Sequence, residues 1–211
     1  MICVSLLLAF CTGSGVRADD SVQLTFDGAK GTDGAPVPWE LRVKTGQPRF
    51  RVVDAPGRPG GLALYFQADD ASFSLNRKIN LDVTKLGELT WSWMVESFPI
   101  ANKNDQVLQV LLAFKGGKVL SYVWDPTRAP NAIWSEGVPL LYQIKVIVAE
   151  AGREPLMHWR SVTRRVDRDF ASVFGKPPPP LEGVRIQSNT QYSKSSGAGF
   201  ISALIFRSAM E

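Results

Sequence analysis

The amino-acid sequence predicts an all-β protein, a jelly-roll-like β-sandwich of two antiparallel sheets with one short helix. Segments rich in β-branched and aromatic residues recur at roughly 8–12-residue spacing, which is typical of sandwich strands. Glycine, proline, asparagine and aspartate separate these segments, and the 211 residues include 18 Gly and 14 Pro. Helical periodicity is confined to one segment. These observations favour two packed sheets over a fold with helices between the strands.

The expected strands follow one another along nearly the whole chain. Residues 107–114 are apolar along almost their full length, which indicates a central strand. Gly116-Gly117 comes next and predicts a tight hairpin turn, because glycine tolerates the positive φ angles that such turns require. The expected strands are 22–26, 39–43, 49–54, 62–67, 73–77, 89–95, 107–114, 119–124, 142–149, 156–161, 184–188 and 200–206.

One helix is expected at residues 166–174. Val166, Phe170 and Val173 fall on one face at helical spacing. Gly175 is placed to end the helix, and the prolines at 177–180 prevent its continuation. We interpret the proline run as a crossover within one sandwich domain that spans residues 19–211.

The N-terminal segment has the pattern of a signal peptide at residues 1–18. Its apolar run, residues 2–10, is too short to cross a bilayer, which needs about 20 residues. Val16 and Ala18 occupy the small-residue positions before a cleavage site, which predicts a mature start at Asp19. We therefore expect a soluble periplasmic or secreted protein with no integral membrane segment once the signal is removed.

Composition excludes several classes of function. The net charge is +4, from 24 Lys plus Arg against 20 Asp plus Glu, and the basic residues are too dispersed for a nucleic-acid interface. Cys3 and Cys11 both lie in the predicted signal, so the mature chain has no disulfide and no thiolate site. The single histidine, His158, is not accompanied by a Gly-x-Ser-x-Gly elbow. We expect no cofactor.

Carboxylates leave two alternatives open. A glycoside hydrolase or lyase needs two carboxylates about 5–10 Å apart across a sugar bond, and nothing in the sequence pairs any two of them. A structural calcium ion is conceivable at loop aspartates such as Asp69, Asp70 and Asp82, but no Asp-x-Asp-x-Asp-Gly loop is present. We assign no metal site. The candidate acids are Asp69, Asp70, Glu96, Asp105, Asp125, Glu136 and Glu150.

Aromatic residues are the strongest positive feature. For Trp91 and Trp93, which share one strand face, we favour a place in the core over the floor of a groove. Other rings lie near polar residues, and sugars stack their apolar C–H faces on rings while amides bind their hydroxyls. We expect such a patch around the loop that follows residues 119–124, with a second rim in the polar segment 187–196. The predicted ligand-binding residues are Tyr122, Trp124, Asp125, Trp134, Asn189 and Gln191.

A series of short motifs in a fixed order extends over about residues 39–206. They are Trp91-Ser92-Trp93, Asn104-Asp105, Ala113-Phe114, Tyr122-Val123-Trp124, Trp159, Arg164-Arg165-Val166, Asp169-Phe170, Phe174-Gly175 and Gly183-Val184-Arg185-Ile186. In these motifs the sequence resembles the bacterial secreted proteins grouped as domain of unknown function 3047. The resemblance implies an exported β-sandwich without an established activity. Its members commonly carry two acids after the strand at 184–188, where this chain has Asn189-Thr190-Gln191. We interpret the basic segment 160–168 first as a solvated, salt-bridged turn. Arg164 and Asp169 also match family positions, so the resemblance leaves an internal ion pair between them open.

Three functions remain open from the sequence. The first is a non-catalytic module that binds carbohydrate or another cell-envelope ligand. The second is a glycoside hydrolase or lyase with a carboxylate pair. The third is a structural or protein-interaction domain whose tryptophans are all buried. Exposed rings beside a polar face would favour the first, and facing acids would favour the second.

Overall fold

The computed structural model describes residues 21–58, 60–100, 104–138 and 142–209, so the predicted signal peptide lies outside the described residues. In chain order the elements are β1 (Ser21–Leu24), β2 (Glu40–Thr45), β3 (Arg49–Asp54), β4 (Leu62–Asp69), β5 (Ser72–Leu81), β6 (Glu88–Ser97), β7 (Gln106–Phe114), β8 (Lys118–Asp125), β9 (Ile133–Val138), β10 (Tyr142–Ala151), β11 (Arg160–Arg165), α1 (Val166–Phe174), β12 (Leu181–Asn189), β13 (Ser196–Ser202) and β14 (Leu204–Arg207).

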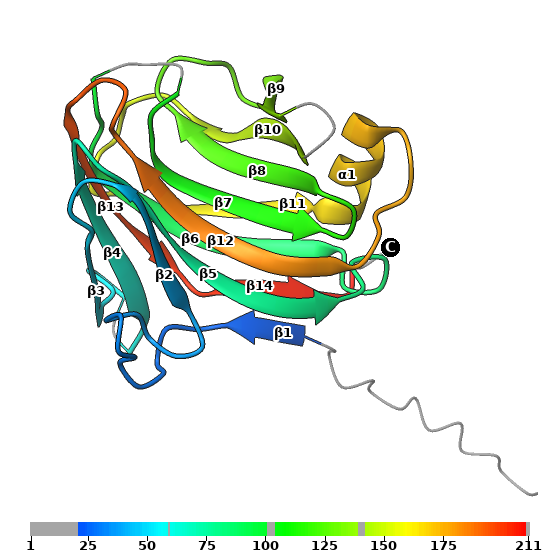
Figure 1. The fold of residues 1–211 in the computed structure, drawn as a ribbon, viewed down its shortest axis with the longest axis horizontal. Coiled ribbons are helices and arrows are strands. Elements are labelled where there is room, and N and C mark those ends of the chain that lie inside the picture. Colours follow the sequence, from blue (N-terminus) through cyan, green and yellow to red (C-terminus); the bar gives the residue numbers. More distant parts are fainter. Residues whose placement is uncertain (1–20, 59, 101–103, 139–141, 210–211) are drawn as a thin grey trace, which may run out of the picture.

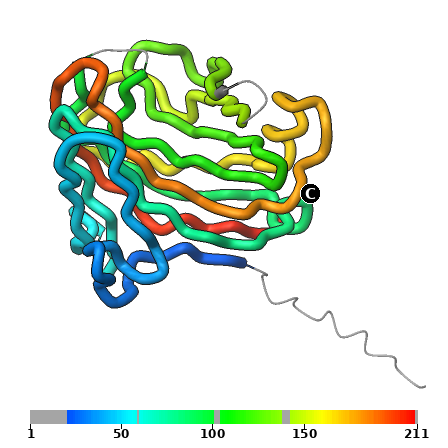
Figure 2. Tube along the Cα trace, in the orientation of Figure 1, coloured from blue at the N-terminus to red at the C-terminus, as the bar shows by residue number. Residues whose placement is uncertain are grey.

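The described strands form two curled sheets that pack face to face (Figure 1). The first, here the β6 sheet, has the order β1-β14-β6-β13-β4-β3, with β11 also paired to β6. The second, here the β7 sheet, has the order β2-β5-β12-β7-β8-β10-β9. Figure 2 shows that the described ends of the chain meet, because β1 pairs with β14. The predicted jelly-roll-like sandwich with one short helix is confirmed.

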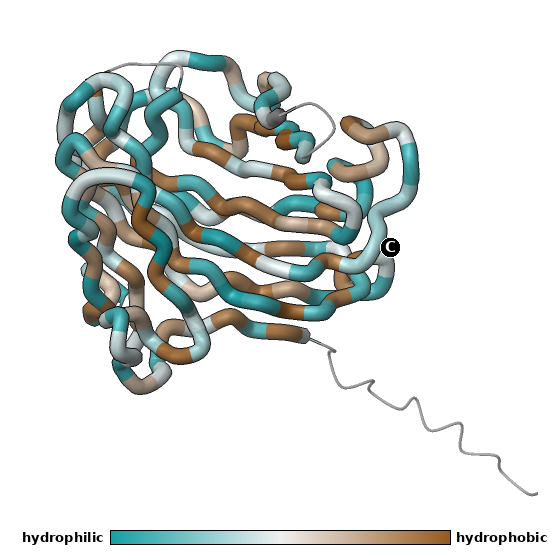
Figure 3. The backbone as a smooth tube through the Cα atoms, in the orientation of Figure 1, coloured by the Kyte–Doolittle hydropathy of each residue, from teal (hydrophilic) through white to brown (hydrophobic). Residues whose placement is uncertain are grey.

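The core lies between the sheets and is rich in aromatic rings. Trp91 and Trp93 are 1% and 0% exposed and meet edge to face at 5.2 Å, which confirms that both belong to the core. Tyr122 and Trp124 from the opposite sheet complete this cluster, at 5.5 Å from Trp91 and 5.9 Å from Trp93 respectively. Figure 3 shows apolar and polar positions alternating along the strands, as expected for sheets with one face on a core.

Four features of the sheets differ from the expected pattern. The segment 133–138 forms an edge strand, the strand expected at 156–161 lies at 160–165, and the segment 200–206 is divided between β13 and β14. In addition, β10 pairs with β8 in parallel, whereas the prediction was two antiparallel sheets. The reason is a crossover: the chain leaves β8, builds the outermost strand β9, and returns as β10 between them.

Helix α1 occupies its predicted range and covers one end of the sandwich. Its buried Phe170 contacts Phe114 of β7, with ring centroids 4.6 Å apart. Gly175 adopts the left-handed conformation at φ 69°, and its N–H donates to the carbonyl of Ala171, which ends the helix as expected. Among the described residues, no helix has the length and apolar character needed to cross a membrane.

Candidate functional site

The β7 sheet has one side on the core and one side directed away from it. Along β7, Val110 and Leu112 belong to the core, so the alternating Gln109 and Leu111 point to the other side. Their exposure is still only 7% each, and Ser121 on β8 is 1% exposed. Neighbouring side chains therefore crowd over these positions, as expected on the inner side of a curled sheet. We call this side the open face; its residues are Ser74, Asn76, Gln109, Leu111, Ser121, Trp134, Tyr142, Arg185 and Gln187.

Strand register divides the open face into a polar half and an apolar half. A row here is a set of paired residues on neighbouring strands. In one row Arg185 of β12 lies between Asn76 of β5 and Leu111 of β7. In the next row Gln187 of β12 lies between Ser74 of β5 and Gln109 of β7. Farther along the same rows, β8, β10 and β9 contribute mainly valines and one tryptophan: Val123, Val146, Val148 and Trp134. The face thus combines amides and a guanidinium with a neighbouring apolar surface.

Arg185 is held in place by the polar half. Its Nε donates to Oδ1 of Asn76 at 2.7 Å, and Nδ2 of Asn76 donates to Oγ of Ser74 at 3.1 Å and to the carbonyl of Glu40 at 3.4 Å. Burial lowers the pKa of the Arg185 guanidinium, and the nearby Tyr142 acts in the opposite direction. The bond to Asn76 directs the Nε edge of the guanidinium toward β5.

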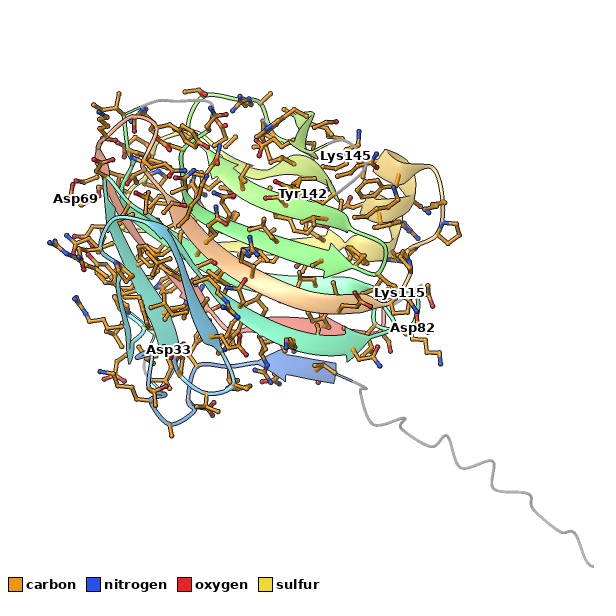
Figure 4. All side chains as sticks on the ribbon, in the orientation of Figure 1. Asp33, Asp69, Asp82, Lys115, Tyr142 and Lys145 are labelled. Carbon is orange, nitrogen blue, oxygen red and sulfur yellow. The ribbon has the colours of Figure 1, made fainter. Side chains whose placement is uncertain are left out.

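Tyr142 is the exposed aromatic ring of the open face, with 44% of its surface exposed. It lies at the start of β10, at the same alternation as Ile144 and Val146, and Figure 4 shows it beside β8. Strands β7 and β8 separate it from Arg185 on β12. The open face therefore has a phenol in its apolar half and a guanidinium in its polar half.

Two of the predicted ligand-binding residues, Tyr122 and Trp124, are in the core instead. They are 0% and 1% exposed, because they alternate with Ser121 and Val123 and so point between the sheets. The Tyr122 hydroxyl donates to Asp169, and Nε1 of Trp124 donates to the carbonyl of Gly152 at 2.9 Å. The prediction that these rings face a ligand is wrong.

Of the next two predicted ligand-binding residues, Asp125 is buried and Trp134 lies on the open face. Asp125 is 3% exposed and accepts hydrogen bonds from the backbone of Thr127 and Arg128 and from the Arg128 guanidinium. Burial opposes ionisation, but these donors lower the pKa of its carboxyl overall. Trp134 does lie on the open face, but Arg128 stacks on its ring at 4.2 Å and its Nε1 donates to Glu136 at 2.7 Å.

Asn189 and Gln191 belong to a loop that is anchored by Asp105. Asn189 is 5% exposed, and its Nδ2 donates to the carbonyl of Asn104 at 2.7 Å. The Asp105 carboxylate accepts the backbone N–H groups of Tyr192 and Ser193 at 3.1 and 2.6 Å. The structure thus joins these two predicted residues to the start of β7, not to the rings of β8. Gln191 is half-buried, and whether it contacts a ligand stays a prediction.

Sequence reasoning missed most of the open face. Asn76, Gln109 and Arg185 were not among the candidates, although Gln109 and Arg185 each lie between apolar neighbours that point to the core, and Asn76 follows the core residue Leu75. The available signal was the alternation in Leu108-Gln109-Val110 and Val184-Arg185-Ile186-Gln187. It identifies outward polar side chains but does not reveal which strands lie side by side.

Glu40 and the candidate Glu136, which lie on the edge strands of the open face, are far apart. Glu40 on β2 and Glu136 on β9 stand on opposite edge strands, six strand steps apart, or about 29 Å along the sheet at ~4.8 Å per step. Asp69 accepts from Ser196 at 2.7 Å, and Asp82 accepts from Thr84. Within the described part of the chain no cluster of three or more metal-binding side chains occurs.

The Arg164–Asp169 ion pair that the family resemblance left open is present and is bidentate, so the interpretation of this segment as a solvated turn is wrong for these two residues. Nε and Nη2 of Arg164 donate to the Asp169 carboxylate at 2.9 and 2.8 Å, and the Tyr122 hydroxyl donates to it at 2.8 Å. Nη1 of Arg164 donates to Oδ1 of Asn131 at 2.8 Å. This cluster ties β8, β11, α1 and the loop before β9 together, so its role is structural.

Replacement of Tyr122 by phenylalanine is expected to reduce the loss of stability at alkaline pH. Burial, followed by the nearby Asp169 charge, raises the pKa of Tyr122 well above its ordinary value. Above about pH 10 the unfolded tyrosine releases its proton and the folded one keeps it, so stability falls by up to about 1.4 kcal/mol per pH unit. Urea unfolding at pH 9 and 11 should show the stability gap between wild type and Tyr122→Phe shrinking by about 1 kcal/mol; a constant gap contradicts this.

A separate cavity of about 400 Å³ lies between the loop after β1 and the edge strand β3. Its lining includes Phe26, Lys30, Pro36, Phe50 and Arg51, and no described amide side chain. It lacks the arrangement of amides beside an apolar surface that distinguishes the open face.

Comparison with known proteins gives one family and several structures of similar fold. A family model described as protein of unknown function (DUF3047) matches residues 38–205. No curated protein shows significant sequence similarity to the chain. Similar structures include the xyloglucanase domain of NopAA, a type three effector from Sinorhizobium fredii, in complex with cellobiose, at 7% identity and TM-score 0.47, covering 78% of this chain and 90% of that one.

An endoglucanase and a group of carbohydrate-binding modules also have a similar fold. Endoglucanase Cel12A from Rhodothermus marinus is 13% identical with a TM-score of 0.43, covering 80% of this chain and 96% of that chain. Carbohydrate-binding modules from the β-sandwich superfamily are 11% identical with a TM-score of 0.41, covering 93% and 64%. The structural neighbours thus include glycoside hydrolases and carbohydrate-binding β-sandwiches.

Proposed function

The chain belongs to the DUF3047 family, whose description states no function, and we propose that this member is a non-catalytic carbohydrate-binding protein whose ligand lies on the open face. The observation that carries the proposal is the composition and order of that face. Asn76, Gln109 and Gln187 lie in adjacent rows beside Arg185 and Ser74. Amides and guanidinium groups bind the hydroxyls of sugars through directed hydrogen bonds.

The aromatic and apolar half of the face supports the same proposal. Tyr142 exposes a ring at the side of the face, and the apolar C–H surface of a sugar packs on such a ring while its hydroxyls reach the amides. Proteins that bind small polar ligands commonly combine an apolar surface with a few placed polar groups.

The positions of the acids favour binding over hydrolysis. Hydrolysis of a glycosidic bond requires two carboxylates about 5–10 Å apart. The outward positions of the central strand β7 carry Gln109, Leu111 and Ala113, and Glu40 and Glu136 stand at the two edges of the sheet. Asp105 and Asp125 are engaged with backbone N–H groups. The glycoside hydrolase or lyase remains the alternative outcome of the test below.

The proposal predicts that removal of one open-face amide weakens glycan binding. Calorimetry against a broad glycan panel identifies the ligand. Gln187→Ala should then raise the Kd of that ligand by up to about tenfold, because the variant loses the binding free energy of one or two neutral hydrogen bonds. Tyr142→Ala should weaken it to a similar degree through loss of ring contact.

The other sheet offers a matched control, Gln67→Ala. Gln67 is a half-buried glutamine at an outward position of β4 in the β6 sheet, and its removal should leave affinity unchanged. Absence of binding to every glycan, or equal losses in Gln187→Ala and Gln67→Ala, would overturn the proposal. Release of reducing sugar from a bound glycan would favour the hydrolase.

A further inference from the structure

Arg185 has no acidic partner among the described residues. Arg128, Arg164 and Arg165 each pair with an aspartate, whereas none of the ion pairs among the described residues includes Arg185. It lies on β12, between Asn76 of β5 and Leu111 of β7, near the middle of the open face. Its place on the open face distinguishes it from the unpaired arginines of the edge strand β3.

The orientation of the guanidinium leaves its outer edge available. Nε is used in the 2.7 Å hydrogen bond to Asn76, which is itself fixed by Ser74 and the backbone of Glu40. Within the described residues neither Nη atom has a hydrogen-bond acceptor. Two parallel N–H groups on such an edge match the two oxygens of a carboxylate.

The surroundings of Arg185 add an electrostatic reason for an anion at this position. The Arg185 side chain is exposed, and the nearby protein still lowers its pKa, so the protein does not compensate its charge. A bound anion would compensate that charge. The flanking Gln187 and Gln109 offer hydrogen bonds to neutral hydroxyls next to it.

We propose that the open face selects an acidic polysaccharide and that Arg185 binds the carboxylate of a hexuronic acid residue. This inference rests on the proposed function and adds the class of ligand to it. The planar, two-oxygen group fits the fixed guanidinium edge, and the remaining hydroxyls of the same sugar fit the amides in the adjoining row. Tyr142 would pack on the C–H face of a neighbouring residue of the chain.

The test compares a uronic acid polymer with its own neutral form. Binding of wild type to polygalacturonate and alginate oligomers, and to their methyl esters, is measured at fixed ionic strength. We expect the acid forms to bind about tenfold or more tightly than the esters, because a charge-assisted pair exceeds a neutral contact. In Arg185→Gln this preference should disappear, while binding to the ester stays within about twofold.

Controls separate this inference from general attraction of a basic protein to polyanions. Arg49→Gln removes the same charge from the exposed edge strand β3 of the other sheet and should keep the preference. Sulfated neutral glycans distinguish a sulfate from a carboxylate as the recognised anion, and stronger binding to the sulfated forms would overturn the uronate assignment. The uronate assignment would also be overturned if Arg185→Gln retained the preference for the acid forms.

Failure of the inference and failure of the proposed function give different results. Equal binding of acid and ester forms, or binding to neutral glycans alone, contradicts the role of Arg185 but leaves the open face as a glycan site. Binding to no glycan in the panel contradicts both. Thermal unfolding of Arg185→Gln serves as the folding check, and its Tm should stay close to that of wild type, because Arg185 is exposed and its side chain makes one hydrogen bond within the described residues.

Discussion

Replacing Asp169 by alanine is expected to lower the free energy of unfolding by about 3 kcal/mol. The substitution leaves two groups without their acceptor: the Arg164 guanidinium and the hydroxyl of Tyr122, which is 0% exposed. The Arg164 side chain keeps 19% exposure, so water compensates part of its loss and the cost stays below that of a fully buried pair. Urea unfolding followed by tryptophan fluorescence measures the effect, since Trp91 contacts Tyr122.

Two further variants identify the cause of that loss. Asp167→Ala removes the neighbouring acid of the same helix, whose partner Arg165 is more exposed, and should cost about 1 kcal/mol. The double variant Arg164→Met/Asp169→Leu should recover part of the stability lost in Asp169→Ala, because it leaves no unpaired charge. Equal losses in Asp169→Ala and Asp167→Ala would show that the ion pair matters no more than a surface contact.

The architecture could be predicted because it depends on local pattern. Alternating apolar residues indicated most strands, and Val166, Phe170 and Gly175 defined the helix and its end. The exceptions have physical reasons. The segment 133–138 includes Gly137 and faces solvent on an edge, so its pattern resembles a loop. The parallel pairing of β8 with β10 depends on a crossover whose direction no local residue specifies.

The candidate site could be predicted only in its chemistry. The open face does place amides near aromatic rings, and it includes Trp134 of the residues named, but its amides are other residues, and ligand binding there stays a prediction. Tyr122 and Trp124 were placed on a rim because polar residues follow them, although their alternation with Ser121 and Val123 directs them to the core. Arg185 became a candidate only through its neighbours on β5 and β7, which lie far from it in the sequence.

Asp105 illustrates how a family motif can be structural, and its replacement gives the second large effect. The carboxylate is 4% exposed and binds three donors of one loop: the N–H groups of Tyr192 and Ser193 and the Ser193 hydroxyl. Alanine at this position leaves two part-buried N–H groups and a hydroxyl without this acceptor, and an unsatisfied group costs about 1–3 kcal/mol where water does not replace the acceptor. We expect Asp105→Ala to lose about 3 kcal/mol of unfolding free energy and to increase hydrogen exchange at the amide of Ser193.

Asp69→Ala is the matched control for Asp105→Ala, since its exposed carboxylate accepts from a single hydroxyl of Ser196, in the strand that follows the same loop. It should cost less than about 1 kcal/mol and leave the exchange of Ser193 unchanged. The two variants also separate stability from binding. If the loop at 190–196 is only a support, Asp105→Ala should retain glycan affinity below its unfolding transition. Loss of affinity in the folded Asp105→Ala protein would instead place Gln191 within the binding site, as the sequence predicted.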